Sequence, residues 1–132
     1  MSMFPDTVTI INVVNNSGIK TYNRHVVSGV LFENNKASIQ REYGVDYTGS
    51  KTCYIPLKSL SDLYVSEAEY KLLSDNAKSD YITLQKGDYI VVGLATDADI
   101  NDLYKLFNDV MRINSIDYFL RGTLQHFEVS GS

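Results

Sequence analysis

Two stretches in the last third of the chain constrain the fold more than any other part of the sequence. Asp80 to Gly93 reads DYITLQKGDYIVVG, and Met111 to Val129 reads MRINSIDYFLRGTLQHFEV. In each stretch, two short runs rich in β-branched and aromatic residues flank a polar break that contains glycine, which is the sequence pattern of a β-hairpin. Because hairpins this short are not stable alone, they predict a closed or packed β-structure.

The length and composition are those of one ordinary domain. The 132 residues are 44% hydrophobic and 11% aromatic, which is enough for a single core, so we expect one domain over residues 1–132. The longest apolar runs are far shorter than the roughly 20 residues that a bilayer requires, so no membrane partner is expected. The N-terminal residues lack the basic and apolar regions of a secretory signal, so we expect folding in a cytoplasm.

The first half of the sequence predicts two strands and a bend. Residues 7–14 (TVTIINVV) predict the first strand, and Gly18 closes the polar turn that follows because glycine accepts a positive φ. Residues 22–32 (YNRHVVSGVLF) predict a second, unusually long strand. Gly29 in its middle predicts a bulge or bend, as at the corner of a barrel, and a strand that serves two sheets.

Residues 34–51 (NNKASIQREYGVDYTGSK) interrupt the strand pattern. They contain two glycines and many polar groups without a sustained period, which predicts a long loop after the second strand. Connections of more than about 12–15 residues without regular structure are uncommon in compact domains and are usually functional or disordered. We expect a functional loop here; a solvent-exposed loop with no role is the alternative.

The second half predicts short strands and one or two short helices. Ser66 and Glu69 have the spacing of a capping box, which predicts a helix within a helical insertion over residues 61–80. Apolar positions predict another helix over 96–108. Gly87 and Asp88 are expected in a structural turn. Further strands are expected at 52–57, which Pro56 marks as an edge or an end, and at 82–84, 89–92, 111–117 and 124–129.

Together these segments predict a fold that is mainly β with one or two short helices (α+β). About seven strands of this length suit a small antiparallel β-barrel or sandwich, with the long loop after the second strand.

One partial match to a calcium loop lies near the predicted second helix. Asp97, Asp99 and Asn101 have the first spacings of such a loop, but Asp102 and Asn108 occupy the positions that need a glycine and a bidentate glutamate. Acidic residues in the first turn of a helix interact favourably with its dipole, which explains them without a metal.

The other reactive side chains show no catalytic pattern. His25 and His126 have no companion ligand at metal-binding spacing. Cys53 lies in an apolar run without a neighbouring base, so we expect a buried thiol. Phosphate-binding glycine motifs are absent from the sequence. We therefore expect no enzyme activity, no catalytic residue, no cofactor and no metal.

The charge distribution differs between the two halves. The net charge is −4; residues 1–61 have six basic and four acidic side chains, a balance of +2, and residues 62–132 have six and twelve, a balance of −6. If the two halves form different faces of the protein, their opposite charges would favour packing between identical or related subunits. A solvated acidic surface is the alternative. The ten Tyr and five Phe residues allow a small nucleic-acid-binding barrel, but Asp precedes several of the Tyr residues, as in Asp80-Tyr81, Asp88-Tyr89 and Asp117-Tyr118, and repels phosphate.

Six strings follow one another along the chain: FPDTVTI, YNRHVVSGVLFE, YIP, ITLQKGDYIVVG, RINSID and QHFEV. Taken in this order they resemble a family of small structural proteins of tailed phages that infect Gram-positive bacteria. The most specific are GDYIVVG (Gly87 to Gly93) and the closing RINSID with QHFEV, and the resemblance covers nearly the whole chain. It implies a head-completion or stopper protein, a small β-barrel that forms a ring below the portal adaptor at the head–tail junction of the virion.

The resemblance gives residues 34–51 a role as a loop that closes the DNA channel until ejection. The residues expected to form hydrogen bonds or ion pairs between ring neighbours, or to act as hinges (Gly44 and Gly49), are Lys36, Arg41, Tyr43, Gly44, Asp46, Tyr47, Gly49 and Lys51.

The partners that the resemblance implies are other copies of the chain, neighbouring virion proteins and DNA. We expect a ring, with a hexamer or dodecamer favoured, a portal adaptor above it, and a tail terminator or tail tube protein below it. Packaged DNA would pass through without sequence-specific binding. The alternatives are a tail terminator or tail-completion protein and, less favoured, the nucleic-acid-binding barrel.

Overall fold

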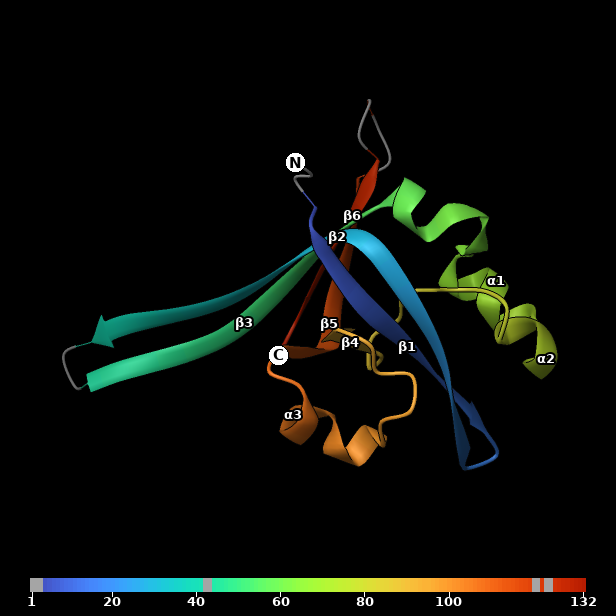
Figure 1. Ribbon diagram of the computed structural model, residues 1–132, viewed down its shortest axis with the longest axis horizontal. Coiled ribbons are helices and arrows are strands. Elements are labelled where there is room, and N and C mark those ends of the chain that lie inside the picture. The colour runs from blue at the N-terminus through green and yellow to red at the C-terminus, as the bar shows by residue number, and fades with distance from the viewer. Residues whose placement is uncertain (1–3, 42–43, 120–121, 123–124) are drawn as a thin grey trace.

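The computed structural model describes residues 4–41, 44–119, 122 and 125–132, and in this part of the chain six antiparallel strands close into a barrel (Figure 1). Around the barrel the order is β1-β2-β3-β6-β5-β4, and β4 pairs with β1 to close it. The predicted class, mainly β with a few short helices, is confirmed. The strands are β1 (Asp6–Asn16), β2 (Ile19–Arg41), β3 (Gly44–Pro56), β4 (Tyr89–Val92), β5 (Val110–Phe119) and β6 (His126–Gly131).

The turn between β1 and β2 is the tight turn that the sequence predicts. Ser17 and Gly18 occupy its centre with φ of 52° and 88°. Two residues with positive φ give a hairpin turn whose twist matches that of the strands on either side, and glycine adopts such a φ without steric cost.

β2 bends where Gly29 adopts a φ of 77°. Asp6 of β1 pairs with Val30, whereas the next residue, Thr7, pairs with Ser28. Gly29 is therefore the extra residue of a β-bulge. Before the bulge β2 pairs with β1, and beyond it β2 pairs with β3. The predicted bend and the predicted sharing of this strand are both confirmed.

The main hydrophobic core fills the barrel. Side chains alternate along each strand, so one set points inward. Phe127 is fully buried and its ring lies 4.8 Å from that of Tyr64 and 5.1 Å from that of Tyr118. A smaller cluster packs the outer face of β1, β4 and β5 against the segment before β5. The buried members of this smaller cluster are Ile11, Val91, Ala95, Leu103 and Val110.

Short helices fill both long connections. Helices occupy residues 61–80 as predicted, and the helical region begins earlier because Pro56 ends β3. Its elements are the 3₁₀ helix η1 (Leu57–Leu63), α1 (Glu67–Leu72) and α2 (Asp75–Lys78), and the helix predicted over 96–108 is shorter, with η2 (Ile100–Asp102) followed by α3 (Leu103–Leu106).

The predicted cap of α1 forms with one change. Ser66 Oγ accepts a hydrogen bond from the amide of Glu69 at 3.2 Å. The Glu69 carboxylate, however, accepts from the Ser66 hydroxyl at 3.1 Å. The capping box was expected to use the Ser66 backbone amide instead.

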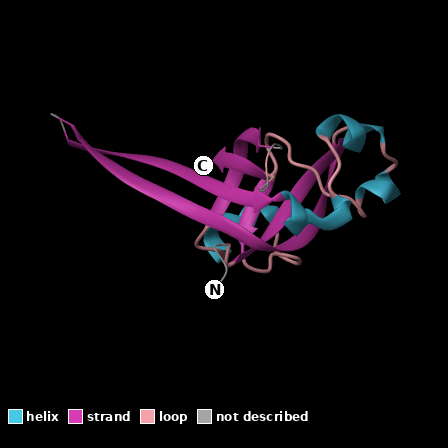
Figure 2. Cartoon of the chain, turned by 90° about the horizontal axis from the view of Figure 1, so that it is seen from above, coloured by secondary structure: helices cyan, strands magenta, loops and turns pink. Residues whose placement is uncertain are grey.

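The prediction of a long loop over residues 34–51 was wrong. β2 and β3 continue through this segment as one antiparallel ladder, in register from the Leu31–Tyr54 pair to the Arg41–Gly44 pair. Backbone pairing does not require apolar side chains, so a polar sequence without a hydrophobic period still forms strands here. We call residues 34–41 and 44–51 the arm; it projects from the barrel as a two-stranded ribbon (Figures 1 and 2).

The prediction of a hairpin over residues 80–93 was also wrong. Ile82 forms only a single parallel bridge with Tyr64, and β4 pairs with β1 and β5 instead. For this reason six strands are found in the described residues where about seven were expected. The second predicted hairpin is confirmed, because β5 and β6 pair antiparallel from Ile113 to Phe119.

Candidate functional site

The arm contains the residues that the sequence nominates for assembly. Lys36 and Arg41 lie on β2, and Asp46, Tyr47 and Lys51 lie on β3. The ladder therefore brings them onto one ribbon instead of a loop.

Three more of the predicted residues belong to this region. Gly44 pairs with Arg41, and Gly49 pairs with Lys36, so both expected hinge positions are part of the ladder. Tyr43 lies outside the described residues.

The outer edges of the arm are open. Around the barrel each strand has neighbours on both sides, but beyond Leu31 the described part of β2 pairs only with β3. On the other strand, β6 pairs with β3 from Lys51 to Pro56 and leaves 44–50 with β2 alone. Unpaired strand edges expose backbone N–H and C=O groups that can pair with another chain.

One hydrogen bond identifies which backbone groups face outward. The amide of Phe32 donates to the Asp6 carboxylate at 2.9 Å, so this N–H points away from β3. In an antiparallel ladder the direction alternates from residue to residue. With no register shift between Leu31 and Arg41, the outward-facing backbone groups of the arm belong to residues 34, 36, 38 and 40 of β2 and 45, 47 and 49 of β3.

Two polar contacts attach the root of the arm to the barrel. Asn34 Nδ2 donates to Asp109 Oδ1 at 3.1 Å. Lys51 Nζ donates to the carbonyl of Val110 at 2.6 Å and lies 5.5 Å from the centre of the Tyr104 ring. Lys51 was predicted to contact a ring neighbour; within the single chain its ammonium fixes the arm to the start of β5.

Gly87 and Asp88 form the predicted turn before β4. The Asp88 side chain belongs to a buried polar network. Its carboxylate accepts from Asn12 Nδ2 at 2.9 Å, from the Val13 amide at 3.1 Å and from Gln85 Nε2 at 3.0 Å. Burial raises the pKa of Asp88 to about 6, although these three hydrogen bonds act to lower it. The network positions the turn within the fold and leaves Asp88 little access to solvent.

Sequence reasoning missed Asn12 and Asp109. The Asn12 amide group pairs with the backbone of Thr83 in both directions, donating to its carbonyl at 2.7 Å and accepting from its amide at 3.2 Å. A polar residue within the run TVTIINVV is the only signal of this role in the sequence. Asp109 gives no such signal, because its partner lies 75 residues away.

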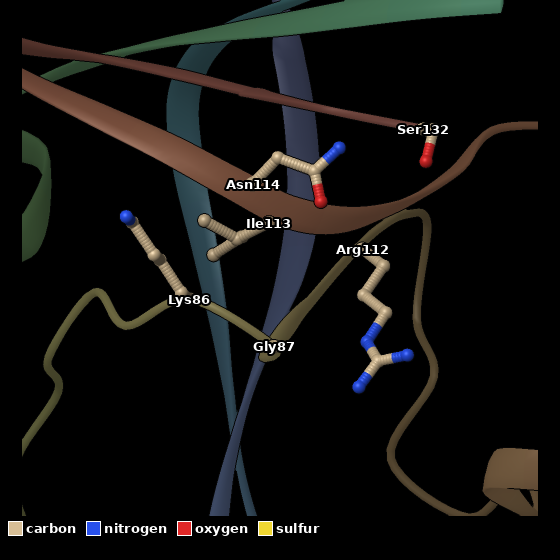
Figure 3. A pocket seen from close by; sticks show the side chains of 6 residues that line it. All are labelled: Lys86, Gly87, Arg112, Ile113, Asn114 and Ser132. Atoms are coloured by element: carbon tan, nitrogen blue, oxygen red, sulfur yellow. The ribbon is translucent and has the colours of Figure 1, made fainter.

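A surface pocket of about 460 Å³ lies beside the turn at Gly87 (Figure 3). Lys86 and Arg112 stand on opposite sides of it, and its remaining lining is Gly87, Ile113, Asn114 and Ser132. These residues supply positive charge but no nucleophile paired with a base, so the pocket does not provide the groups that acid–base or covalent catalysis needs.

Burial shifts the pKa of two reactive side chains noted in the sequence, Cys53 and His25. Cys53 is fully buried, as predicted, and burial raises the pKa of its thiol. Burial also lowers the pKa of His25, which favours the neutral imidazole. In the part of the chain that the structure describes, no three His, Cys, Asp or Glu side chains are grouped to hold a metal ion. No described helix is long and apolar enough to cross a bilayer.

Exposed aromatic rings lie among carboxylates near the β5–β6 hairpin. Phe119 stacks on His126 with ring centres 5.0 Å apart. Asp117 of β5 pairs with Glu128 of β6, which places two like charges directly opposite each other. This surface gives little support to the nucleic-acid-binding alternative, because the carboxylates repel phosphate.

Comparison with known proteins gives a family without an assigned activity. A family model described as "Family of unknown function (DUF6751)" matches residues 3–132, so the chain belongs to this family. No curated protein and no solved structure matches the chain.

Proposed function

We propose that this member of the DUF6751 family is a non-enzymatic structural subunit that assembles with copies of itself into a ring at the head–tail interface of a tailed phage. The observation that carries the proposal is the arm, a ribbon with two open edges on an otherwise closed barrel. A two-stranded ribbon is marginally stable alone, so its persistence is best explained by a partner that covers it.

The resemblance in the sequence supplies the location and the neighbours. In this proposal the chain is a stopper or head-completion subunit, with a portal adaptor above and a tail terminator or tail tube protein below. The arms point into the channel and retain packaged DNA. Lys36 and Arg41 would provide a few positive charges near the DNA, which allow weak contact without sequence recognition.

The first test is the assembly state of the full chain. Analytical ultracentrifugation and negative-stain microscopy should show a ring, with a hexamer or dodecamer expected. An arm-shortened variant, in which Asn-Gly replaces residues 36–49, is the matched control. Asn35 and Ser50 face each other in the ladder as a pair whose backbone groups point inward, so a two-residue turn can connect them without disturbing the barrel. We expect this variant to stay monomeric.

The second test locates the protein in phage particles. An antibody fragment against this chain should label the head–tail junction in electron micrographs. After disruption, label that stays on heads supports the stopper, and label that stays on tails supports the tail-terminator alternative. Particles without label would refute a virion role. Tail-less heads made with the arm-shortened variant should lose DNA faster than those made with the wild-type chain.

A further inference from the structure

The two edges of the arm differ in direction and in charge. β2 runs outward from the barrel and β3 returns. From Asn34 to Arg41, the charged residues of β2 are Lys36 and Arg41, both basic. From Gly44 to Lys51, β3 has the acidic Asp46 and, at the root of the arm, Lys51, whose ammonium binds the Val110 carbonyl. Beyond the root, the β2 edge is thus basic and the β3 edge acidic.

We propose that the β2 edge of each arm pairs with the β3 edge of the arm on the next copy, so that the arms form one continuous antiparallel β-wall. This inference rests on the proposed ring and names the contact that closes it. In a cyclic ring all arms point the same way, which places an outgoing β2 beside a returning β3. Such neighbours are antiparallel, the hydrogen-bonded arrangement that is more stable per residue.

A two-fold dimer satisfies the edges less well. Pairing β2 with β2 would bring Lys36 and Arg41 of both copies onto neighbouring strands, and the β3 edges would remain open. Head-to-tail pairing instead puts basic strands beside acidic ones and leaves no edge unpaired once the ring closes. The partner that fits the arm is therefore a second copy of this chain in rotational symmetry.

The root of the arm favours the same arrangement. Asn34 and Lys51 attach the ribbon to Asp109 and Val110, so the direction of the arm is set in the monomer. The strands that continue beyond this root extend about 25 Å at roughly 3.3 Å per residue. Because the direction of the arm is already set, edge pairing on assembly has a smaller conformational-entropy cost.

Hydrogen exchange measured on the full chain tests the pairing directly. The outward amides, at residues 34, 36, 38 and 40 of β2 and 45, 47 and 49 of β3, should exchange at least roughly tenfold more slowly in the assembly than in the dilute monomer. An assembly in which these amides stay unprotected would overturn the edge pairing but leave the ring intact. A wild-type chain that remains monomeric at every concentration would overturn the ring and the pairing together.

Two variants at one position separate backbone pairing from side-chain effects. Ser38→Pro removes an outward N–H and leaves the inward bonds of the arm in place. Ser38→Val changes the side chain and keeps the N–H. We expect Ser38→Pro to prevent assembly with an unchanged barrel, judged by thermal unfolding, and Ser38→Val to assemble. Equal assembly of the two variants would refute the pairing at this edge.

Charge exchange tests the choice of partner edge. Lys36→Glu combined with Arg41→Glu should weaken assembly at low salt, and Asp46→Lys alone should weaken it as well. The triple variant should recover assembly because both strands then have reversed charges. Asp97→Lys, at an exposed site off the arm, controls for the change in net charge that Asp46→Lys causes. A triple variant weaker than either parent would contradict pairing between β2 and β3.

Discussion

The barrel and the arm share the strands β2 and β3, yet they differ in what satisfies the backbone. In the barrel every strand has neighbours on both sides and apolar side chains fill the interior. In the arm each strand has one neighbour and an open edge. One pair of strands can thus stabilise the monomer over half of its length and leave its outer edges unpaired over the other half.

Gly29 and Pro56 lie on the barrel parts of the two strands that form the arm. The bulge at Gly29 releases β2 from β1, so the strand can leave the barrel. β3 ends at Pro56, which forms the last pair of this strand with β6. Between these points the Asp6 carboxylate caps the amide of Phe32, which satisfies the first outward group beyond β1. β2 and β3 are therefore paired within the barrel, and the arm begins beyond it.

The largest expected effect comes from the barrel core. Phe127→Ala should lower the free energy of unfolding by about 3–5 kcal/mol, because it leaves a cavity between the rings of Tyr64 and Tyr118. Urea denaturation measures the change. The arm-shortened variant is the contrast, with an expected loss of less than about 1 kcal/mol in the monomer. A loss as large as that of Phe127→Ala would show that the arm contributes to the core.

The second-largest expected effect is a dependence of barrel stability on pH, which arises from Asp88. The pKa of Asp88 is about 6 in the folded chain against the ordinary value of 3.8. Because the folded pKa is the higher one, the stabilisation is fully present below pH 3.8 and is lost as pH rises through about 6. Asp88 alone should therefore make the fold less stable at pH 7 than at pH 3 by on the order of 2–3 kcal/mol.

Unfolding measured from pH 3 to pH 7 isolates this group when the wild type is compared with Asp88→Asn. The variant lacks the titration, so the difference between the two curves should change across this range. It is also less stable at low pH, because an amide group cannot accept from all three donors around position 88. Asp97→Asn controls for the loss of an exposed carboxylate. Parallel curves for wild type and Asp88→Asn would contradict the raised pKa.

The smallest effect should come from the root of the arm. Lys51→Met keeps the length of the side chain but removes the ammonium that binds the Val110 carbonyl and faces the Tyr104 ring. We expect a loss of about 1 kcal/mol in stability and faster hydrogen exchange at the inward amides of the arm. Lys58→Met, at an exposed position on η1, is the matched control. Similar exchange in both variants would mean that Lys51 does not hold the arm.

Local chemistry made part of this fold predictable. Gly18 and Gly29 are needed where φ is positive, and Ser66 with Glu69 begins α1, so turn, bulge and cap follow from residue type. The arm was not predictable in this way. Its strands lack an apolar face, and a ladder held by backbone groups leaves no hydrophobic period in the sequence.

Long-range contacts explain what else the sequence did not reveal. Residues 82–84 have the composition of a strand, but the Asn12 side chain pairs with the Thr83 backbone where a full strand was expected. The contact of Lys51 with the carbonyl of Val110, 59 residues away, was not predicted. Neither partner can be identified from spacing, because both depend on how β1 and β5 are placed in the closed barrel.

The sequence by itself determined the class of the fold, its turns and caps and the buried state of Cys53, because these depend on neighbouring residues and on burial preference. Only the tertiary structure decided that residues 34–51 form an arm, which edge groups point outward and where the arm is fixed. The need for glycine at position 131 also depends on the tertiary structure, since a Cβ there would lie 2.0 Å from the Arg112 carbonyl oxygen. Such constraints arise when distant strands meet, and hydrogen bonds and steric exclusion between them act at distances that sequence order does not encode.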